Sequence, residues 1–356
     1  MIDVISFTGR GAKLSFKIKD ALREDVGLYT GRKNEPLMEQ GLVYVPEPLE
    51  EWTKSRFENK IPMIFIGAAG IAVRAIAPHV SDKMKDPPVI VMDEAGQFVI
   101  PLLSAHCGGG ITLTEILARE LNATPVITTA TDVNGLFAVD CFARDNKLAV
   151  KNKDDIKKVS SELLSGRRLS VKAEGGCIKG PLPEELELKR ETEVADIVLS
   201  VYESSGEKHR ELIRLFPRAV HLGIGCRAGK TAEEIEEAVK SALSGAGISP
   251  LSLCRVASVD LKAGEEGLRR FAEERKLPFI TFSAEELKNA KGDFDASTFV
   301  AEITGVDNVC ERAAWLSAFV SSGDKGAPEL VIKKSAGNGI TVAAACEAWE
   351  VCVQDV

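Results

Sequence analysis

Short apolar runs that end in a glycine turn and lead into a segment of helical periodicity recur along this chain. Examples lie at 2–7 before Gly9 and Gly11, at 63–66 before Gly67 and Gly70, and at 219–222 before Gly223 and Gly225. Each predicts a strand, a turn and a helix. Strands that alternate with helices are typical of mostly parallel sheets. We therefore expect a multi-domain α/β protein, with mostly parallel sheets and flanking helices in both its amino- and carboxy-terminal domains.

The chain length predicts more than one domain, since 356 residues exceed the usual size of a single hydrophobic core. Residues 1–132 and 216–356 carry the α/β pattern. Residues 133–215 have weaker signals, and we interpret them as a small middle segment between an amino-terminal domain at 1–132 and a carboxy-terminal domain at 216–356. In the carboxy-terminal domain, Thr231 followed by Glu234 predicts a capping box at the start of a helix.

Charge and cysteine content argue against several functional classes. The net charge of −8 and the lack of long basic runs disfavour a nucleic-acid partner. No apolar run approaches the ~20 residues of a membrane helix, and the first residues do not resemble a signal peptide. We expect a cytoplasmic protein with no membrane partner, whose eight cysteines are free thiols. Because the cysteines form no CxxC pair and the four histidines no HExxH motif, we expect no metal site.

The stretch 101–110, PLLSAHCGGG, is an apolar run that ends in Ser, His and three glycines before a helical segment. The backbone N–H groups of Gly108, Gly109 and Gly110 at a helix N-terminus can face an oxyanion or a carboxylate. His106 beside them can titrate near neutral pH and act as a general base on water. A tight strand-to-helix turn with a hydrogen-bonded histidine explains the same residues equally well.

A second polar cluster follows at 125–132, PVITTATD, where the apolar run 125–129 predicts a buried strand. In open α/β sheets ligands bind at the carboxyl ends of strands. Thr128, Thr129 and Asp132 therefore lie where a site is expected, and Asp132 could orient His106. Helix capping by Thr and Asp is the alternative interpretation.

Long motifs in both halves of the chain carry a resemblance to a known family. They are GAAGIAVRAIAPHVSDKMKDPPVIVMDEAGQFVIPLLSAHCGG from Gly67, PVITTATD from Pro125, GIGCRAGKT from Gly223, ASVDLKAGEEGL from Ala257, TGVDNVCERAA from Thr304, and the late Lys333 with GIT from Gly339. In this order they resemble the cobalt-precorrin-5A hydrolases of anaerobic cobalamin (vitamin B12) biosynthesis. Two positions depart from the family's pattern, which has Gly at Ala105 and Asn at Ile111; losing the Asn amide removes a polar group beside the proposed site.

The resemblance implies a hydrolase of tetrapyrrole (porphyrin) metabolism. It would open the δ-lactone of cobalt-precorrin-5A and release the bridging carbon with its methyl as acetaldehyde, giving cobalt-precorrin-5B. No cofactor is implied, because the cobalt belongs to the substrate. Lactone opening needs an activated water and donors for the oxyanion, for which His106 and the amides of Gly108 to Gly110 are the candidates. Ser104 as a covalent nucleophile is the less favoured variant, because no G-x-S-x-G elbow surrounds it.

The substrate carries many carboxylates, so an acidic chain must bind it through local cations. Arginine suits a carboxylate better than lysine, because its planar fork can bind both oxygens. The substrate-binding candidates that match the family motifs are Gly67, Gly70, Arg74, Lys83, Gly108, Gly109, Gly110, Thr128, Thr129, Gly223, Gly225, Arg227, Lys262 and Lys333. Expected partners are the small tetrapyrrole, a second copy of the chain in a homodimer, or a neighbouring pathway enzyme in transient contact.

Two other functions fit parts of the sequence. A non-catalytic tetrapyrrole carrier would use the same residues, and acetaldehyde release would distinguish the enzyme from it. Nucleotide binding is suggested by Gly223-x-Gly225-x-x-Ala228, but that pattern wants an acidic residue about 20 positions later. The chain has Gly247-Ile248-Ser249 there.

Overall fold

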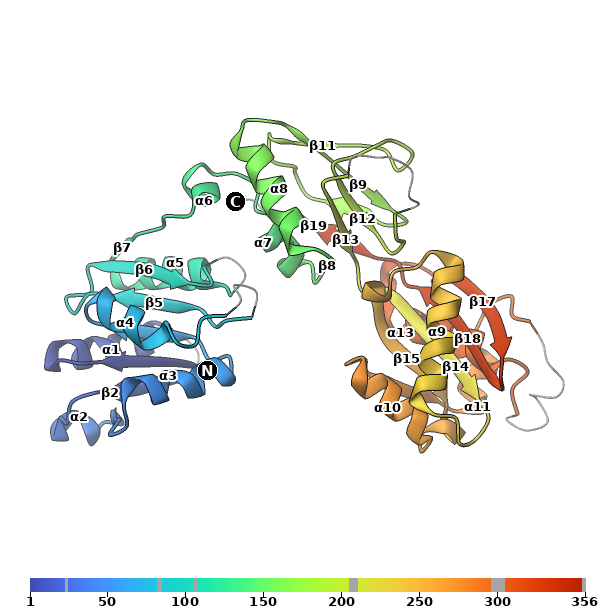
Figure 1. Cartoon of the computed structure of the whole chain (residues 1–356), viewed down its shortest axis with the longest axis horizontal. Coiled ribbons are helices and arrows are strands. Elements are labelled where there is room, and N and C mark those ends of the chain that lie inside the picture. The colour runs from blue at the N-terminus through green and yellow to red at the C-terminus, as the bar shows by residue number, and fades with distance from the viewer. Residues whose placement is uncertain (23–24, 82–84, 106–107, 205–210, 296–304, 354–356) are drawn as a thin grey trace. The chain divides into compact units, whose positions relative to one another are not determined.

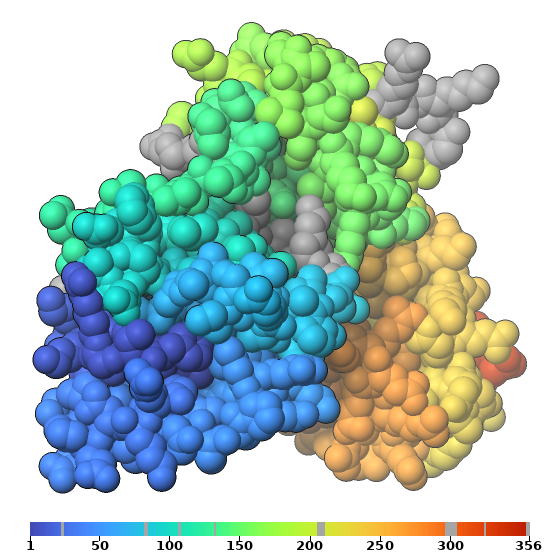
Figure 2. Space-filling model, turned by 60° about the vertical axis from the view of Figure 1, so that its left-hand side comes forward, coloured from blue at the N-terminus to red at the C-terminus, as the bar shows by residue number. Residues whose placement is uncertain are grey.

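The computed structural model describes residues 1–22, 25–81, 85–105, 108–204, 211–295 and 305–353, with the backbone alone at Asp132 and Asp324. The remaining residues are drawn in grey in Figures 1 and 2. The chain divides into two compact units, Met1–Gly135 and Leu136–Val356. The three-part division expected from the sequence stays a prediction.

The first unit is built on a seven-stranded sheet of order β3-β2-β1-β4-β5-β6-β7. Its strands are β1 (Ile2–Ser6), β2 (Val26–Thr30), β3 (Val43–Tyr44), β4 (Met63–Ile66), β5 (Val89–Met92), β6 (Phe98–Leu103) and β7 (Thr124–Pro125). All neighbours are parallel except β5 and β6, which form an antiparallel hairpin. The mostly parallel sheet predicted for this half is confirmed.

Helices cover both faces of this sheet (Figure 1). They are α1 (Gly9–Ala21), α2 (Glu35–Met38), α3 (Leu49–Glu58), α4 (Ala69–Ile76), α5 (Gly110–Leu121) and the short α6 (Ala130–Val133). Successive strand residues point to opposite faces, so β4 sends Ile64 and Ile66 into one core with α1 and α5. Its Met63 and Phe65 enter a second core with α3 and α4.

The strand predicted at 125–129 was too long. The strand β7 comprises only Thr124–Pro125. Val126 still donates its N–H to the carbonyl of Val99 at 2.9 Å, after which the chain leaves β6 and turns into α6. Thr128 and Thr129 therefore lie in the connection rather than at the end of a strand.

The second unit contains two five-stranded sheets. The first has the order β11-β9-β12-β13-β8, formed by β8 (Ala149–Val150), β9 (Leu169–Glu174), β11 (Leu186–Leu188), β12 (Ile197–Ser200) and β13 (Ile213–Phe216). It packs with α7 (Val139–Asp145) and α8 (Lys153–Leu164). Two further strands, β10 (Cys177–Lys179) and β19 (Glu350–Cys352), pair in parallel, so the end of the described chain returns to this region.

The second sheet of this unit has the order β16-β15-β14-β18-β17. Its strands are β14 (Val220–Cys226), β15 (Leu253–Val259), β16 (Phe279–Phe282), β17 (Glu329–Gly337) and β18 (Ile340–Cys346). The first three are parallel, and β17 and β18 are antiparallel additions. Both units thus have the predicted α/β class with mostly parallel strands.

Helices α9 (Ala232–Ala246) and α10 (Glu266–Glu274) cover one face of this second sheet. The other face packs against α11 (Ala284–Asn289) and α13 (Val309–Ser322). Helix α9 begins with the predicted capping box, in which Thr231 accepts from Glu234 N and Glu234 accepts from Thr231 N. Within the described chain, no helix combines the length and apolar character that crossing a membrane requires.

Candidate functional site

A cavity of about 680 Å³ lies in the second unit, where β14, β15, β17 and β18 meet the amino end of α13. Small and apolar residues form most of its wall, among them Val259, Val309 and Ile340. Its polar lining includes Arg227, Lys262, Asn308, Lys334 and Asn338. Apolar walls with a few convergent polar groups are typical of a small-molecule site.

Two glycines of β14 allow α13 to approach the sheet closely enough to form this cavity. A Cβ at Gly223 would lie 1.8 Å from the carbonyl oxygen of Cys310, and one at Gly225 would lie 2.6 Å from Thr341 Oγ1. Gly225 lines the cavity, whereas Gly223 is buried beneath the first turn of α13. The structure therefore gives Gly223 a packing role, in contact with the helix rather than with the cavity.

The amino end of α13 opens onto the cavity. Its N-cap Asn308 accepts from Glu311 N at 3.0 Å, and Asn308, Val309 and Cys310 all line the wall. A helix N-terminus carries a partial positive charge. This end of the cavity thus favours anionic ligand groups.

Three cations line the cavity with different degrees of pairing. Lys262 Nζ lies 3.0 Å from Glu265 Oε2 in an ion pair. Arg227 and Lys334 have no ion-pair partner in the described part of the chain. Arg227 is exposed, and its backbone N–H donates to the carbonyl of Gly339 at 2.9 Å. The predicted candidates Gly225, Arg227 and Lys262 are therefore brought together here.

Lys333, by contrast, is exposed and is not among the residues that line the cavity, whereas its neighbour Lys334 is. The sequence analysis also did not identify Asn308 and Asn338. No local sequence pattern distinguishes Lys334 from Lys333, because the two lysines are adjacent and differ only in the direction in which the strand orients their side chains. Asn338-Gly339, however, is a hairpin-turn signal that could have placed Asn338 at the end of β17.

Two cysteines contribute to the cavity wall, and both remain protonated at neutral pH. Burial raises the pKa of Cys310 to about 11. Burial also raises the pKa of Cys226, although Lys262 opposes the shift. Nucleophilic attack and metal binding need the thiolate, so these side chains act as small apolar groups here. In the part of the chain that the structure covers, no group of three or more His, Cys, Asp or Glu side chains could hold a metal ion.

The serine–glycine loop of the first unit connects β6 to α5. Ser104 has a φ of 52°, and its hydroxyl is buried with no hydrogen-bond partner among the described residues. Gly108 N donates to the Ser104 carbonyl at 3.1 Å, and a Cβ at Gly108 would lie 2.7 Å from that oxygen. Gly109 is the N-cap of α5 at a φ of 79°, and Gly110 opens the helix. The tight turn therefore requires glycine and places the amino end of a 12-residue helix beside Ser104.

The other candidates of the first unit are more scattered. Gly67 donates to the Met92 carbonyl at 2.8 Å just before α4, and Arg74 is exposed with Nη1 3.3 Å from the Gly70 carbonyl. Thr128 is exposed and Thr129 half-buried beyond β7. His106 and Lys83 lie outside the described residues, as does the Asp132 side chain.

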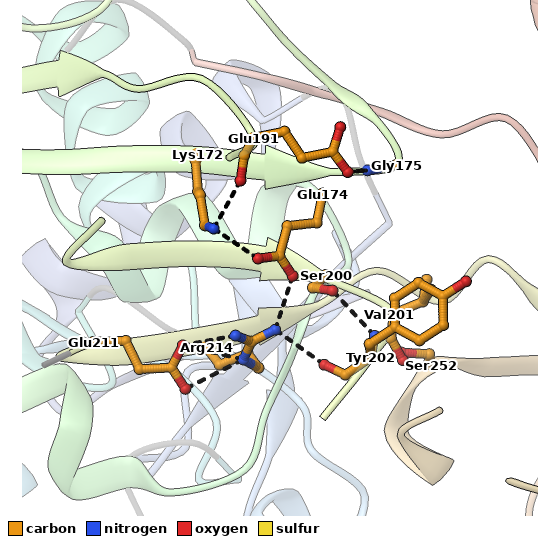
Figure 3. Close-up of polar contacts among 10 residues, drawn as sticks. All are labelled: Lys172, Glu174, Gly175, Glu191, Ser200, Val201, Tyr202, Glu211, Arg214 and Ser252. Carbon is orange, nitrogen blue, oxygen red and sulfur yellow. Dashed lines mark hydrogen bonds and ion pairs between the residues drawn. The ribbon is translucent and has the colours of Figure 1, made fainter. Parts of the chain in front are cut away.

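Another polar cluster lies on one face of the sheet β11-β9-β12-β13-β8, which we call the middle sheet (Figure 3). Glu174 accepts from Lys172 Nζ at 2.8 Å and from Arg214 Nη1 at 3.1 Å, and Arg214 Nη2 lies 2.8 Å from Glu211. Lys172 also donates to the Glu191 carbonyl, and Arg214 to that of Tyr202. These side chains border a small cavity of about 200 Å³, and each of the two cations is paired.

A buried Ser–His–Glu arrangement lies elsewhere in the second unit. His221 Nδ1 is 2.7 Å from Ser317 Oγ, and Nε2 is 3.0 Å from Glu347 Oε2. The residue types match those of a hydrolytic triad. Ser317 and His221 are both fully buried, however, so no substrate carbonyl can reach the hydroxyl in this conformation. The cluster joins β14, α13 and the end of β18.

Comparison with known proteins relates both halves of the chain to one family. Residues 51–132 match Cobalamin synthesis G N-terminal, and residues 220–345 match Cobalamin synthesis G C-terminus. The cobalt-precorrin-5A hydrolase of Salmonella typhimurium is 39% identical over 293 residues, which cover 80% of this chain and 83% of that protein. The one from Priestia megaterium is 31% identical over 305 residues, covering 81% and 80%.

A solved structure of a cobalamin biosynthesis protein G homolog from Sulfolobus solfataricus is 22% identical to the chain, with a TM-score of 0.38 over 97% of this chain and 96% of that one. The identity to the curated relatives extends over most of each protein, and it joins the two family halves in one order. The chain therefore belongs to the cobalt-precorrin-5A hydrolase family.

Proposed function

We infer that this protein is a cobalt-precorrin-5A hydrolase, which opens the δ-lactone of its substrate and releases acetaldehyde to give cobalt-precorrin-5B. The observation that carries this function is the 39% identity to a curated enzyme of that name over 80% of the chain. Cobalt enters as part of the substrate. We also propose that the enzyme works in the cytoplasm without a resident cofactor, alone, as a homodimer, or in transient contact with a neighbouring pathway enzyme.

The chemistry needs a base and donors for an oxyanion. Water adds to the lactone carbonyl, the acyl C–O bond breaks, and a carboxylate and a hydroxyl are freed. The freed hydroxyl then loses its proton and the bond from its carbon to the ring breaks. That carbon leaves with its methyl as acetaldehyde, while the ring carbon keeps the electron pair and takes up a proton. We assign the base to His106, oriented by Asp132, and the oxyanion donors to the amides at Gly108 to Gly110. The amino end of α5, where these glycines lie, supports the second assignment.

Ser104 is the second candidate for direct attack on the carbonyl. Its positive φ and its buried hydroxyl without a partner among the described residues are unusual for a serine. Strained backbone and orphaned polar groups cluster at functional sites. This supports a role for Ser104 in the reaction, either as the nucleophile or as a donor to the reacting oxygen.

The cavity of the second unit is the proposed binding site for the edge of the macrocycle. Its apolar walls suit the ring, and Arg227, Lys262 and Lys334 suit the acetate and propionate carboxylates. We assign the remaining motif candidates Gly67, Gly70, Arg74, Lys83, Thr128 and Thr129 to substrate binding in the first unit. Lys333 is a weaker candidate for substrate binding than Lys334, because Lys333 does not line the cavity.

The test is anaerobic incubation with cobalt-precorrin-5A, with acetaldehyde and the pigment spectrum as readouts. We expect acetaldehyde release that survives EDTA treatment. His106→Ala should lower kcat by roughly 10²–10⁴-fold, the usual contribution of a positioned base. His79→Ala is the matched control, since His79 is a half-buried histidine of the same unit, whose Nε2 lies 3.2 Å from the Glu50 carbonyl.

Each part of the proposal has an outcome that would contradict it. Pigment that binds but stays unchanged would identify a carrier instead of an enzyme. Unchanged turnover by His106→Ala would remove the assigned base. Loss of turnover with EDTA, restored by zinc, would reveal a resident metal.

A further inference from the structure

Glu311 is a buried carboxylate behind the wall of the large cavity. It lies in the first turn of α13, is only 1% exposed, and has no ion-pair partner in the described parts of the chain. A buried charge without a counter-ion is costly unless hydrogen bonds satisfy it. Its Oε1 accepts from Lys334 N at 2.7 Å. Its Oε2 accepts from Asn308 Nδ2 at 2.7 Å and from Asp295 N at 2.9 Å.

The bond to Lys334 lies at an irregularity of β17. Ile332 pairs with Ala344 and Ser335 pairs with Val342, so β17 advances three residues while β18 advances two. An extra residue of this kind is a β-bulge, which turns nearby side chains in new directions. The Glu311 carboxylate binds the N–H of Lys334 inside this bulge. At this bulge Lys334 lines the cavity while Lys333 is exposed.

The bond to Asn308 fixes the neighbouring part of the wall. Asn308 Oδ1 accepts from Glu311 N at 3.0 Å, while Asn308 Nδ2 donates to the Glu311 carboxylate. The two residues thus hold each other, and Asn308 Nδ2 also donates to the Asp295 carbonyl at 2.9 Å. Asn308 itself lines the cavity. One carboxylate therefore connects two wall residues that lie 26 positions apart in the sequence, at 308 and 334.

We propose that Glu311 is a positioning residue of the substrate cavity, which holds the β17 bulge and the N-cap of α13 so that Lys334 binds a substrate carboxylate at the amino end of α13. This inference rests on the proposed function. Glu311 does not touch the substrate, since it is buried behind the wall. Lys334 supplies the full charge and the amino end of α13 its partial positive charge, while Glu311 fixes the positions of Lys334 and of the N-cap Asn308.

The experiment compares Glu311→Gln, Lys334→Met and the double variant, measuring pigment affinity, KM and kcat. Gln has the same shape, but its NH₂ must face an N–H donor, so at least one of the three bonds is lost. We expect Glu311→Gln to weaken pigment affinity and raise KM by roughly tenfold, as for one lost hydrogen bond to a charge, with kcat at saturation unchanged. If Glu311 acts through Lys334, the double variant should be little weaker than either single one.

Glu286→Gln is the matched control. Glu286 is also the third residue of a helix, α11, and it also accepts hydrogen bonds at the helix start, from Ser283 N and Oγ. It does not line the large cavity. We expect this variant to keep the pigment affinity and KM of the wild type.

Several results would overturn the inference. Wild-type affinity in folded Glu311→Gln, or effects that add fully in the double variant, would reduce Glu311 to a structural role. If Glu311→Gln does not fold, Lys334→Met still tests the inference. Unchanged pigment affinity in Lys334→Met would mean that Lys334 does not bind the substrate, so that Glu311 would have no binding group to position. Wild-type protein that binds pigment without releasing acetaldehyde would refute the proposed function, while the comparison of affinities would still test Glu311.

Discussion

Two regions of the second unit contain lysine and arginine side chains that differ in whether a carboxylate neutralises them. On the middle sheet, Lys172 and Arg214 are each paired with carboxylates in one network (Figure 3). In the large cavity, Arg227 and Lys334 have no such partner among the residues that the structure describes. The difference shows that a basic residue is a stronger candidate for ligand binding where the fold leaves its charge without a carboxylate partner.

The energetic consequence differs between the two regions. A half-buried pair loses its attraction and leaves a desolvated charge behind when one partner is removed. A cation that faces a cavity loses little stability on removal, but the site loses a partner for an anionic ligand. We therefore expect substitutions on the middle sheet to affect folding, and those in the cavity to affect binding.

The largest effect is expected for Arg214→Met. Arg214 bonds to Glu174, Glu211 and the carbonyl of Tyr202, and its side chain is only 13% exposed. Removing it should lower the free energy of unfolding by about 2–3 kcal/mol, without changing pigment affinity. Urea unfolding and pigment titration measure the two quantities. Weaker binding with unchanged stability would reverse the roles assigned to the two regions.

A smaller effect, on binding alone, is expected for Arg227→Ala. Pigment affinity should fall by roughly tenfold, or ~1.4 kcal/mol, and the free energy of unfolding should not change. Added salt should weaken binding by the wild type more than by the variant, because the lost contact is electrostatic. Arg227→Lys is the control that keeps the charge without the planar fork, so its affinity should be intermediate. Equal affinities of wild type and Arg227→Ala at two ionic strengths would mean that Arg227 does not bind the substrate.

Acid should weaken the network of Lys172, Glu174 and Arg214 by protonating Glu174. Burial alone would raise its pKa, but hydrogen bonds from Lys172 and Ser200 and the charge of Arg214 lower the pKa below its ordinary value of 4.5. A carboxyl whose folded pKa is depressed contributes stability above its unfolded pKa, and loses it as the pH falls through the folded pKa. Protonation of Glu174 should therefore lower the free energy of unfolding by on the order of 1 kcal/mol as the pH falls below about 4.5. Unfolding measured from pH 7 to pH 3 should show a shallower decline in Glu174→Gln; identical slopes would contradict the assignment.

The smallest effect is expected on the surface of the first unit. Arg119 pairs with Glu120 at 3.1 Å, with side chains 71% and 43% exposed. Exposed pairs of this kind contribute less than about 1 kcal/mol, so Arg119→Ala should change neither the free energy of unfolding nor pigment affinity by a measurable amount. A clear loss in either would show that exposure is a poor guide to which cations matter.

Much of the fold could be predicted because its signals are local. The apolar runs and the helical periodicity identified β1, β4 and β14 with the helices that follow them, and the Thr231–Glu234 spacing identified the start of α9. The prediction failed at 125–129, where an apolar run reads as a strand but the chain leaves the sheet after Val126. Whether such a run continues to pair depends on a distant strand, which local periodicity does not encode.

By itself, the sequence determined the α/β class, the family motifs and the candidates Gly225, Arg227 and Lys262, which come together in one cavity. Only the tertiary structure decided that Gly223 packs against Cys310, that Lys334 rather than Lys333 lines the wall, and that Glu311 connects the wall from behind. The physical reason is that a residue type and its spacing are local properties. Register, bulges and charge pairing depend on which distant segments meet, and a shift of one residue moves a side chain to the other face of a sheet.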